Sequence, residues 1–207
     1  MCNLYNVTSN QQAILDFTRA LTAGVGNQKP SLDVYPDYAA PIVRAAADGA
    51  RELVLARWGM PSPPRYGTAP VTNIRNVKSP HWRRWLGVES RCVVPATSFC
   101  EWSGEKGEKR KVWFAVNDDK PLFAFAGIWT RWRGVRKKSE PEMDHEIFGF
   151  LTCEPNELVR PVHAKAMPVI LTRQDEIDHW LTSPAAEALQ LQRPLPDNEL
   201  IIVSDAA

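Results

Sequence analysis

The chain has 207 residues, of which 44% are hydrophobic, enough for one domain with a sizeable core. Its 25 Lys and Arg nearly cancel its 24 Asp and Glu, so an anion site requires local clustering of charge. The apolar stretches are shorter than the roughly 18 residues of a membrane span, and the opening lacks a secretory pattern. The four cysteines show neither disulfide-scaffold density nor, with the histidines, a metal-ligand spacing. We therefore expect one domain over residues 1–207, a cytoplasmic location, and no cofactor or metal.

The first predicted element is a helix near the N-terminus. Thr8 and Gln11 have the spacing of a capping box, and the apolar residues that follow recur at helical intervals. This pattern predicts a helix over residues 9–23. Residues 30–41 then have the composition of an extended passage with turns.

Short β segments dominate the rest of the chain. Two apolar runs separated by Asp48-Gly49 predict a hairpin. Six further strands are expected to begin at Cys92, Lys111, Leu122, Glu146, Met167 and Leu200. Thr172 with Asp175 predicts another helix, and Pro184 precedes a short one. Many short strands with few helices indicate an α+β protein built on a barrel or a strongly curved sheet.

Cys2 is distinguished by its position, because removal of Met1 would leave a residue with both a free α-amine and a thiol. Their ordinary pKa values, about 7.7–8.0 and about 8.5, make both groups usable near neutral pH. Such a 1,2-aminothiol condenses with an aldehyde to a Schiff base, which the thiol closes to a thiazolidine. The open form of an abasic deoxyribose is such an aldehyde. Taken alone, however, a cysteine behind an initiator methionine also occurs by chance.

Five motifs give a more specific signal, because they occur in a fixed order over most of the chain. They are Met1-Cys2-x-x-Tyr5, Arg57-Trp58-Gly59, Asn73-Ile74-Arg75, Phe99-Cys100-Glu101-Trp102, and His163 followed by Met167-Pro168-Val169. In this order they resemble the SOS response-associated peptidase (SRAP) family. The resemblance implies an α+β fold with a pseudo-symmetric β-barrel and peripheral helices. It also implies self-removal of Met1 and a thiazolidine crosslink to abasic sites in single-stranded DNA during the DNA damage response.

The same resemblance assigns catalytic roles to four residues, Cys2, Asn73, Glu101 and His163. Asn73 would hold the N-terminus and the sugar through its amide, whereas an asparagine before a strand is often only a turn residue. Glu101 would shuttle protons with a pKa raised by burial, and a solvated glutamate at a strand end is the alternative. His163 would be the second acid–base group, although a lone histidine is more often structural.

Basic residues alternate with aromatic ones in two stretches, a composition that suits a groove for single-stranded DNA. Arg75 resembles a family arginine that contacts the phosphate beside the captured sugar. The residues expected to contact DNA are Arg75, Lys78, Trp82, Arg83, Arg84, Trp85 and Lys165. The second stretch comprises Arg131, Trp132, Arg133, Arg136, Lys137 and Lys138. Ordinary surfaces also carry such stretches, so both stay open, with the first favoured.

Three segments depart from the family pattern. Many members continue the opening cysteine as Gly-Arg, where this chain has Asn3-Leu4, and the usual Tyr-Asn-x-Ala-Pro appears as Asp37-Tyr38-Ala39-Ala40-Pro41. The common Asp-Arg after the histidine is replaced by Ala164-Lys165-Ala166. These changes remove cationic and polar groups expected near DNA, and Lys165 keeps a charge without the two-pronged geometry of arginine.

Two other functions are compatible with the same residues. Cys2, His163 and Asn73 also make the Cys/His/Asn set of a thiol peptidase or N-terminal-nucleophile amidohydrolase that acts beyond its own Met1. A non-catalytic binding module, with Cys2 incidental, is the third hypothesis. The favoured one is abasic-site capture with autopeptidase and lyase-type activity. We expect a monomer that binds single-stranded DNA containing abasic sites, associates with the nucleoid when bound, and contacts no membrane.

Overall fold

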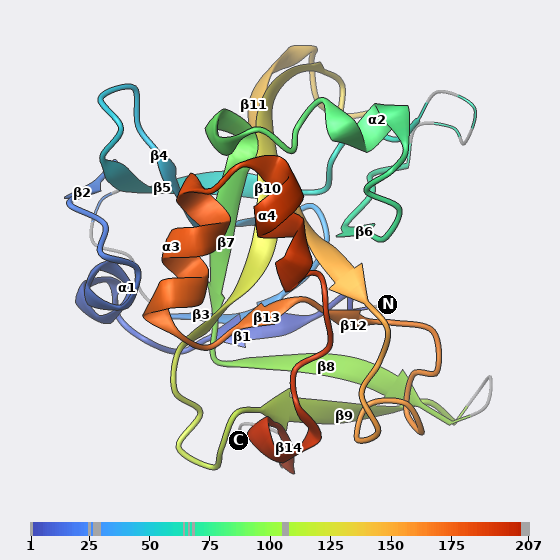
Figure 1. The fold of residues 1–207 in the computed structure, drawn as a ribbon. Helices are drawn as coiled ribbons and strands as arrows, with labels where there is room; N and C mark the ends of the chain where they lie inside the picture. Colours follow the sequence, from blue (N-terminus) through green and yellow to red (C-terminus); the bar gives the residue numbers. More distant parts are fainter. Residues whose placement is uncertain are drawn as a thin grey trace.

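Two β-sheets with helices at their periphery make up the fold (Figure 1). The computed structural model describes residues 2–24, 26, 30–63, 65, 67, 69–104 and 108–203. No helix in these ranges is long and apolar enough to span a membrane.

Five strands of the larger sheet close into a barrel. In order around it they are β5 (Arg51–Trp58), β4 (Ala39–Ala45), β7 (Arg91–Ala96), β10 (Phe123–Gly134) and β11 (Met143–Cys153). The ring closes because β11 pairs in parallel with β5 as well as antiparallel with β10. Short strands extend it, namely β2 (Thr22–Ala23), β6 (Asn73–Ile74), β12 (Met167–Pro168) and β13 (Ile170–Leu171). The predicted α+β architecture with a barrel is confirmed.

The second sheet carries the N-terminus. Its strand order is β14 (Ile201–Val203), β9 (Arg110–Ala115), β8 (Ser98–Ser103), β1 (Tyr5–Val7) and β3 (Ser31–Val34), and its pairs are antiparallel. Because β1 lies directly beside β8, the N-terminal segment is brought next to the strand that holds Glu101.

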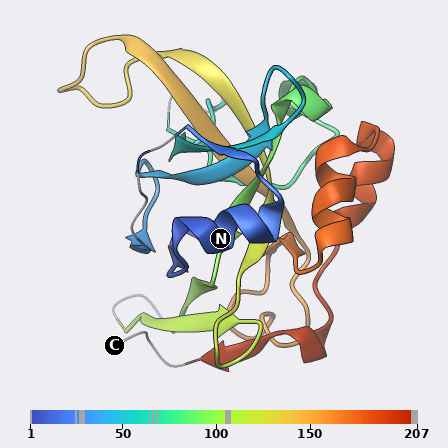
Figure 2. The same ribbon diagram turned by 90° about the vertical axis from the view of Figure 1, so that its left-hand side faces the viewer.

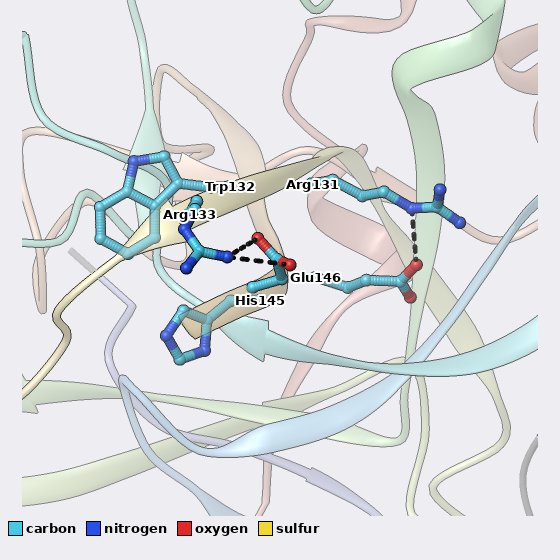
Figure 3. A pocket seen from close by; sticks show the side chains of 6 residues that line it. Arg131, Trp132, Arg133, His145 and Glu146 are labelled. Atoms are coloured by element: carbon cyan, nitrogen blue, oxygen red, sulfur yellow. Dashed lines mark hydrogen bonds and ion pairs between the residues drawn. The ribbon is translucent and has the colours of Figure 1, made fainter. Parts of the chain in front are cut away.

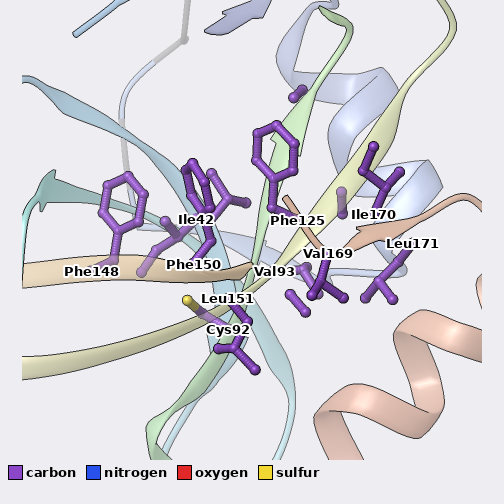
Figure 4. Close-up of a cluster of buried hydrophobic side chains, with 14 of the residues drawn as sticks. Ile42, Cys92, Val93, Phe125, Phe148, Phe150, Leu151, Val169, Ile170 and Leu171 are labelled. Atoms are coloured by element: carbon purple, nitrogen blue, oxygen red, sulfur yellow. The ribbon is translucent and has the colours of Figure 1, made fainter. Parts of the chain in front are cut away.

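Aliphatic and aromatic side chains pack together in the hydrophobic core (Figure 4). The rings of Phe125 and Phe150 lie 4.5 Å apart, and Trp58 stacks on Phe150 at 5.2 Å. Burying each such side chain contributes about 1.5–3 kcal/mol to stability. Gly127 is required where β10 pairs with β7, because a Cβ there would lie 2.8 Å from the sulfur of Cys92, the residue opposite it.

The helices are short and lie outside the barrel. They are α1 (Gln11–Thr18), α2 (Pro80–Arg83), α3 (Gln174–Thr182) and α4 (Ala185–Ala188), with 3-10 turns η2 (Val88–Ser90), η3 (Leu189–Leu191) and η4 (Asp197–Glu199). The prediction of a helix over 9–23 is wrong at both ends. The Thr8 hydroxyl bonds the Thr97 hydroxyl at 3.1 Å, and Asn10 caps the helix instead. Arg19 then adopts a left-handed conformation, with φ 54°, which ends it.

The ends of β10 and β11 project from the barrel as a two-stranded arm (Figure 2). A group of partly buried ion pairs ties the arm to the barrel. Arg136 donates to the Asp37 carboxylate and to the Gly59 carbonyl, both at 2.8 Å. Arg57 at the end of β5 pairs with Asp37 at 2.6 Å and with Glu140 at 2.8 Å.

Replacing Asp37 by asparagine is expected to lower the free energy of unfolding by about 1–3 kcal/mol at pH 7, because two guanidinium groups lose their shared carboxylate. Hydrogen bonds from these arginines lower the pKa of Asp37 although partial burial opposes them. Its stabilising effect is therefore present above the unfolded-state pKa, near 3.9, and is lost as pH falls through the lower folded-state pKa. Urea unfolding at several pH values measures this, with Asp144→Asn, an exposed ion-pair carboxylate on the arm, as control. Equal stability of the two variants would contradict the assignment.

Candidate functional site

Cys2 and Asn73 are joined by a hydrogen bond. The Asn73 side-chain amide donates to the Cys2 carbonyl at 2.8 Å and to the Thr72 hydroxyl at 2.8 Å. Asn73 lies on β6, which pairs with β11, and only 8% of the residue is exposed. The indole N–H of Trp58 donates to the Thr72 carbonyl at 3.2 Å, so a core side chain fixes the backbone that carries Asn73. Asn73 is therefore placed to hold the N-terminal segment.

The Cys2 thiol is buried, with 1% of the residue exposed. Its sulfur donates a weak hydrogen bond to the Leu4 carbonyl at 3.5 Å. Burial raises the pKa of this thiol well above its usual range, and the negative charge of Glu101 raises it further. The resting thiol is therefore protonated, and it needs a nearby base before it acts as a nucleophile.

Glu101 lies on β8, opposite Val112 of β9, and 1% of the residue is exposed. Burial raises the pKa of its carboxyl group, while nearby positive charge, including that of His163, opposes the shift. Because burial disfavours the ionised form, Glu101 exchanges a proton closer to neutral pH than an exposed glutamate does.

His163 lies in the loop between β11 and β12 and is held by the backbone of Ala166. Its Nδ1 lies 2.9 Å from the Ala166 carbonyl oxygen and 3.2 Å from the Ala166 nitrogen. These contacts with the Ala166 backbone fix the orientation of the His163 ring.

The four residues expected to be catalytic come together from four separate segments. Asn73 is hydrogen-bonded to Cys2. The charge of Glu101 raises the pKa of the Cys2 thiol, and the charge of His163 lowers the pKa of Glu101. The structure thus gathers an amide donor, a thiol, a carboxyl group with a raised pKa and an imidazole. This set is suited to acid–base and nucleophilic chemistry. Within the described ranges, no three His, Cys, Asp or Glu side chains are placed to bind a metal ion.

Most cations of the first basic stretch face solvent. The Arg75 side chain is 44% exposed and meets the Glu154 carboxylate at 3.4 Å. Arg84 lies over the half-buried ring of Trp85, with 4.7 Å between its guanidinium carbon and the ring centre. Lys78, Arg83 and, beyond His163, Lys165 are also exposed. These side chains therefore present positive charge to solvent.

Trp82 has a different environment from its neighbours. Only 6% of the residue is exposed, it belongs to the hydrophobic core, and the His81 ring packs on it at 4.5 Å. Trp82 anchors α2 to the core, so the DNA contacts that we propose below do not include it.

The second basic stretch lies on the arm, and four of its five cations, all but Lys138, pair with carboxylates within the described part of the chain. Arg131 meets Glu146 and Arg133 meets Asp144, each at 3.4 Å (Figure 3). The antiparallel register sets these residues directly opposite one another. Arg136 and Lys137 of this stretch pair with Asp37, and these ion pairs tie the arm to the barrel. A hollow of about 640 Å³ on the arm is accordingly lined by balanced charges rather than by a cationic surface.

Two residues that contribute to the site, Thr72 and Trp58, were not predicted from the sequence to do so. Thr72 accepts from Asn73 and donates to the Asn3 side chain at 3.4 Å, and only its position beside Asn73 hints at this. Trp58 was part of a motif, but nothing in the neighbouring sequence indicates its hydrogen bond to the Thr72 carbonyl, 14 residues away. Asp37, expected to mark the loss of a polar group near the cleft, instead forms the arm's ion pairs.

Solved structures share this fold. A protein from Bacteroides thetaiotaomicron superposes with a TM-score of 0.78 at 23% identity, covering 99% of this chain and 93% of that one. A protein from Bordetella bronchiseptica has a TM-score of 0.76 at 23% identity, covering 98% of this chain and 100% of its own.

Sequence comparison is more specific. Abasic site processing protein YoaM of Bacillus subtilis (strain 168) is 30% identical over 202 residues, 89% of this chain and 82% of the relative. Abasic site processing protein YoqW of the same organism is 30% identical over 201 residues, 93% of this chain and 85% of the relative. The family model for SOS response associated peptidase (SRAP) matches residues 1–205. The chain therefore belongs to the SRAP family.

Proposed function

We propose that Cys2, once Met1 is removed, captures abasic sites in single-stranded DNA as a thiazolidine. The observation that carries the proposal is the meeting of Cys2 with Asn73, Glu101 and His163 in one buried site. The names of two relatives, abasic site processing proteins, support the choice of substrate. In this proposal the exposed cations around α2, with Arg75 and Lys165, hold the phosphates.

The first step joins the α-amine of Cys2 to the aldehyde carbon of the open sugar. Nitrogen attacks the carbon, the carbonyl oxygen takes up a proton, and water leaves to give a protonated Schiff base. A protonated Glu101 supplies the proton that lets water leave, a role suited to a carboxyl group whose pKa is raised. Asn73 holds the Cys2 carbonyl and so orients the amine.

The second step closes the ring. The Cys2 sulfur adds to the carbon of the C=N bond, the nitrogen receives the electron pair, and the thiol proton passes to a base. We assign this base to His163 or the ionised Glu101, because the buried thiol does not ionise unaided. Burial also keeps water from the product.

The same groups account for two accompanying activities. For Met1 removal, water adds to the Met1 carbonyl, the C–N bond to Cys2 breaks, and the new amine takes a proton. For lyase-type cleavage, the Schiff base forms again, a base removes a sugar proton beside it, and the 3′ phosphate leaves. Glu101 and His163 are the proposed proton carriers in both.

Intact-mass spectrometry before and after exposure to an abasic oligonucleotide tests the proposal. We expect a protein lacking Met1 and, after exposure, a heat-stable adduct whose mass equals protein plus oligonucleotide minus one water. An oligonucleotide without the abasic site should give no adduct. Processed protein that leaves abasic DNA unmodified would overturn the proposal. Cysteine-dependent turnover of a peptide library, unaffected by abasic DNA, would instead favour the thiol peptidase.

A further inference from the structure

A groove of about 350 Å³ runs along β9, outside the four-residue site. Its volume lies in the range of about 300–1,000 Å³ that is usual for small-molecule sites. The residues that matter for its chemistry are Ser103, Arg110, Lys111, Val112, Val162 and Ile202. β14 pairs with β9 at Trp113–Ala115, and the groove extends from this pairing along the preceding residues of β9.

Two residues that line the groove are direct neighbours of candidate-site residues. Val112 of β9 lies directly opposite Glu101 of β8 in the antiparallel pair. Val162, which also lines the groove, immediately precedes His163. A chain that leaves the site past Glu101 and His163 would therefore meet the walls of this groove first.

The lining combines positive charge with apolar surface. Arg110 is exposed and the Lys111 side chain is 29% exposed. Lys111 meets the Asp33 carboxylate at 4.0 Å, the outer limit of an ion pair. The described lining includes no acidic side chain, and Val112, Val162 and Ile202 supply the apolar surface. Cations beside an apolar wall match the phosphate and base of a nucleotide.

We infer that this groove binds the nucleotide on one side of the captured sugar. Arg110 and Lys111 hold its phosphate, and the apolar wall packs against its base. The inference rests on the proposed function. It adds a second contact region, separate from the cations around α2 that the sequence pointed to.

Salt-dependent binding of an unmodified single-stranded oligonucleotide tests the charge contacts without any capture chemistry. Each lost phosphate contact reduces the slope of log affinity against log salt by about 0.7. For Arg110→Gln with Lys111→Gln we expect a reduction of about 0.7–1.4 and roughly three- to tenfold weaker binding at low salt. The control is Arg131→Gln with Arg133→Gln on the arm, where acidic partners already neutralise both charges. A slope unchanged by the groove substitutions would overturn the inference and favour another occupant, such as an extended peptide along β9.

Capture of one-sided substrates tests the position of the nucleotide. Two oligonucleotides carry the abasic site at opposite ends, so that each has neighbours on one side only. At a subsaturating DNA concentration, the protein with both Arg110→Gln and Lys111→Gln should capture one of these oligonucleotides three- to tenfold more slowly than wild type. It should capture the other at the wild-type rate. Equal effects on both would overturn the inference. If the wild type captures neither, the proposed function fails, while the salt slope still reports whether the groove binds DNA.

Discussion

Replacing Cys2 by serine is expected to reduce heat-stable capture of abasic DNA by at least about two orders of magnitude. Serine keeps the α-amine and nearly the same shape, so a Schiff base still forms. Its hydroxyl is a far weaker nucleophile near neutral pH than a thiol activated by a base, and ring closure fails. Denaturing electrophoresis after heating measures the loss. Reduction with borohydride should recover an adduct in the variant, because it traps the Schiff base.

Cys153→Ser is the matched control for this substitution. Cys153 is also buried, at 3% exposed, and its sulfur likewise lies within weak hydrogen-bond distance of backbone carbonyls. It belongs to β11, and no role in the proposed reaction is assigned to it. Wild-type capture by Cys153→Ser would tie the loss to the N-terminal position. Heat-stable adducts that persist in Cys2→Ser would contradict the thiazolidine chemistry itself.

The long strands were predictable because their own residues specify them. β7, β10 and β11 are runs of apolar and β-branched residues, and the Asp48-Gly49 turn between β4 and β5 is confirmed, with Gly49 at φ 83°. β1 and β6 were missed, since strands of three and two residues exist only where longer neighbours offer an edge. The strand expected from Met167 is divided at Val169, whose backbone bonds both Leu151 and Ala126.

The site was predictable to the extent that it is carried by motifs. The order of the motifs led to the prediction of Cys2, Asn73, Glu101 and His163 as one site, and in the structure these residues interact with one another, while their catalytic roles stay a proposal. The charge state of the arm was not predictable from composition, because the acidic partners Glu146 and Asp144 lie 15 and 11 residues from their arginines. The burial of Trp82 was likewise hidden, since α2 has only four residues and shows no helical period.

Replacing Glu101 by glutamine is expected to separate stability from activity. Burial raises the folded-state pKa of Glu101, so the folded protein binds this proton more tightly than the unfolded chain does. The stabilising effect of that proton is full below the unfolded-state pKa, near 4.3, and is lost as pH rises through the folded-state pKa. Glutamine resembles the protonated carboxyl group in shape and does not ionise at any pH in the experiment. Urea unfolding should therefore show Glu101→Gln gaining stability relative to wild type between pH 5 and 8.

Capture by the same variant should be slower by roughly 100-fold at neutral pH, the usual effect of losing a general acid or base. If protonated Glu101 donates the proton that lets water leave, the wild-type rate of Schiff-base formation falls as pH rises through the raised pKa of Glu101. The rate of Glu101→Gln should not show this fall. Single-turnover rates across pH measure both, with Glu157→Gln, whose side chain is 73% exposed in a surface ion pair, as control. A variant that is more stable but slower indicates that Glu101 is kept for chemistry at a cost in stability. A variant that captures at the wild-type rate at every pH would leave Glu101 without a catalytic role and leave His163 as the acid–base group.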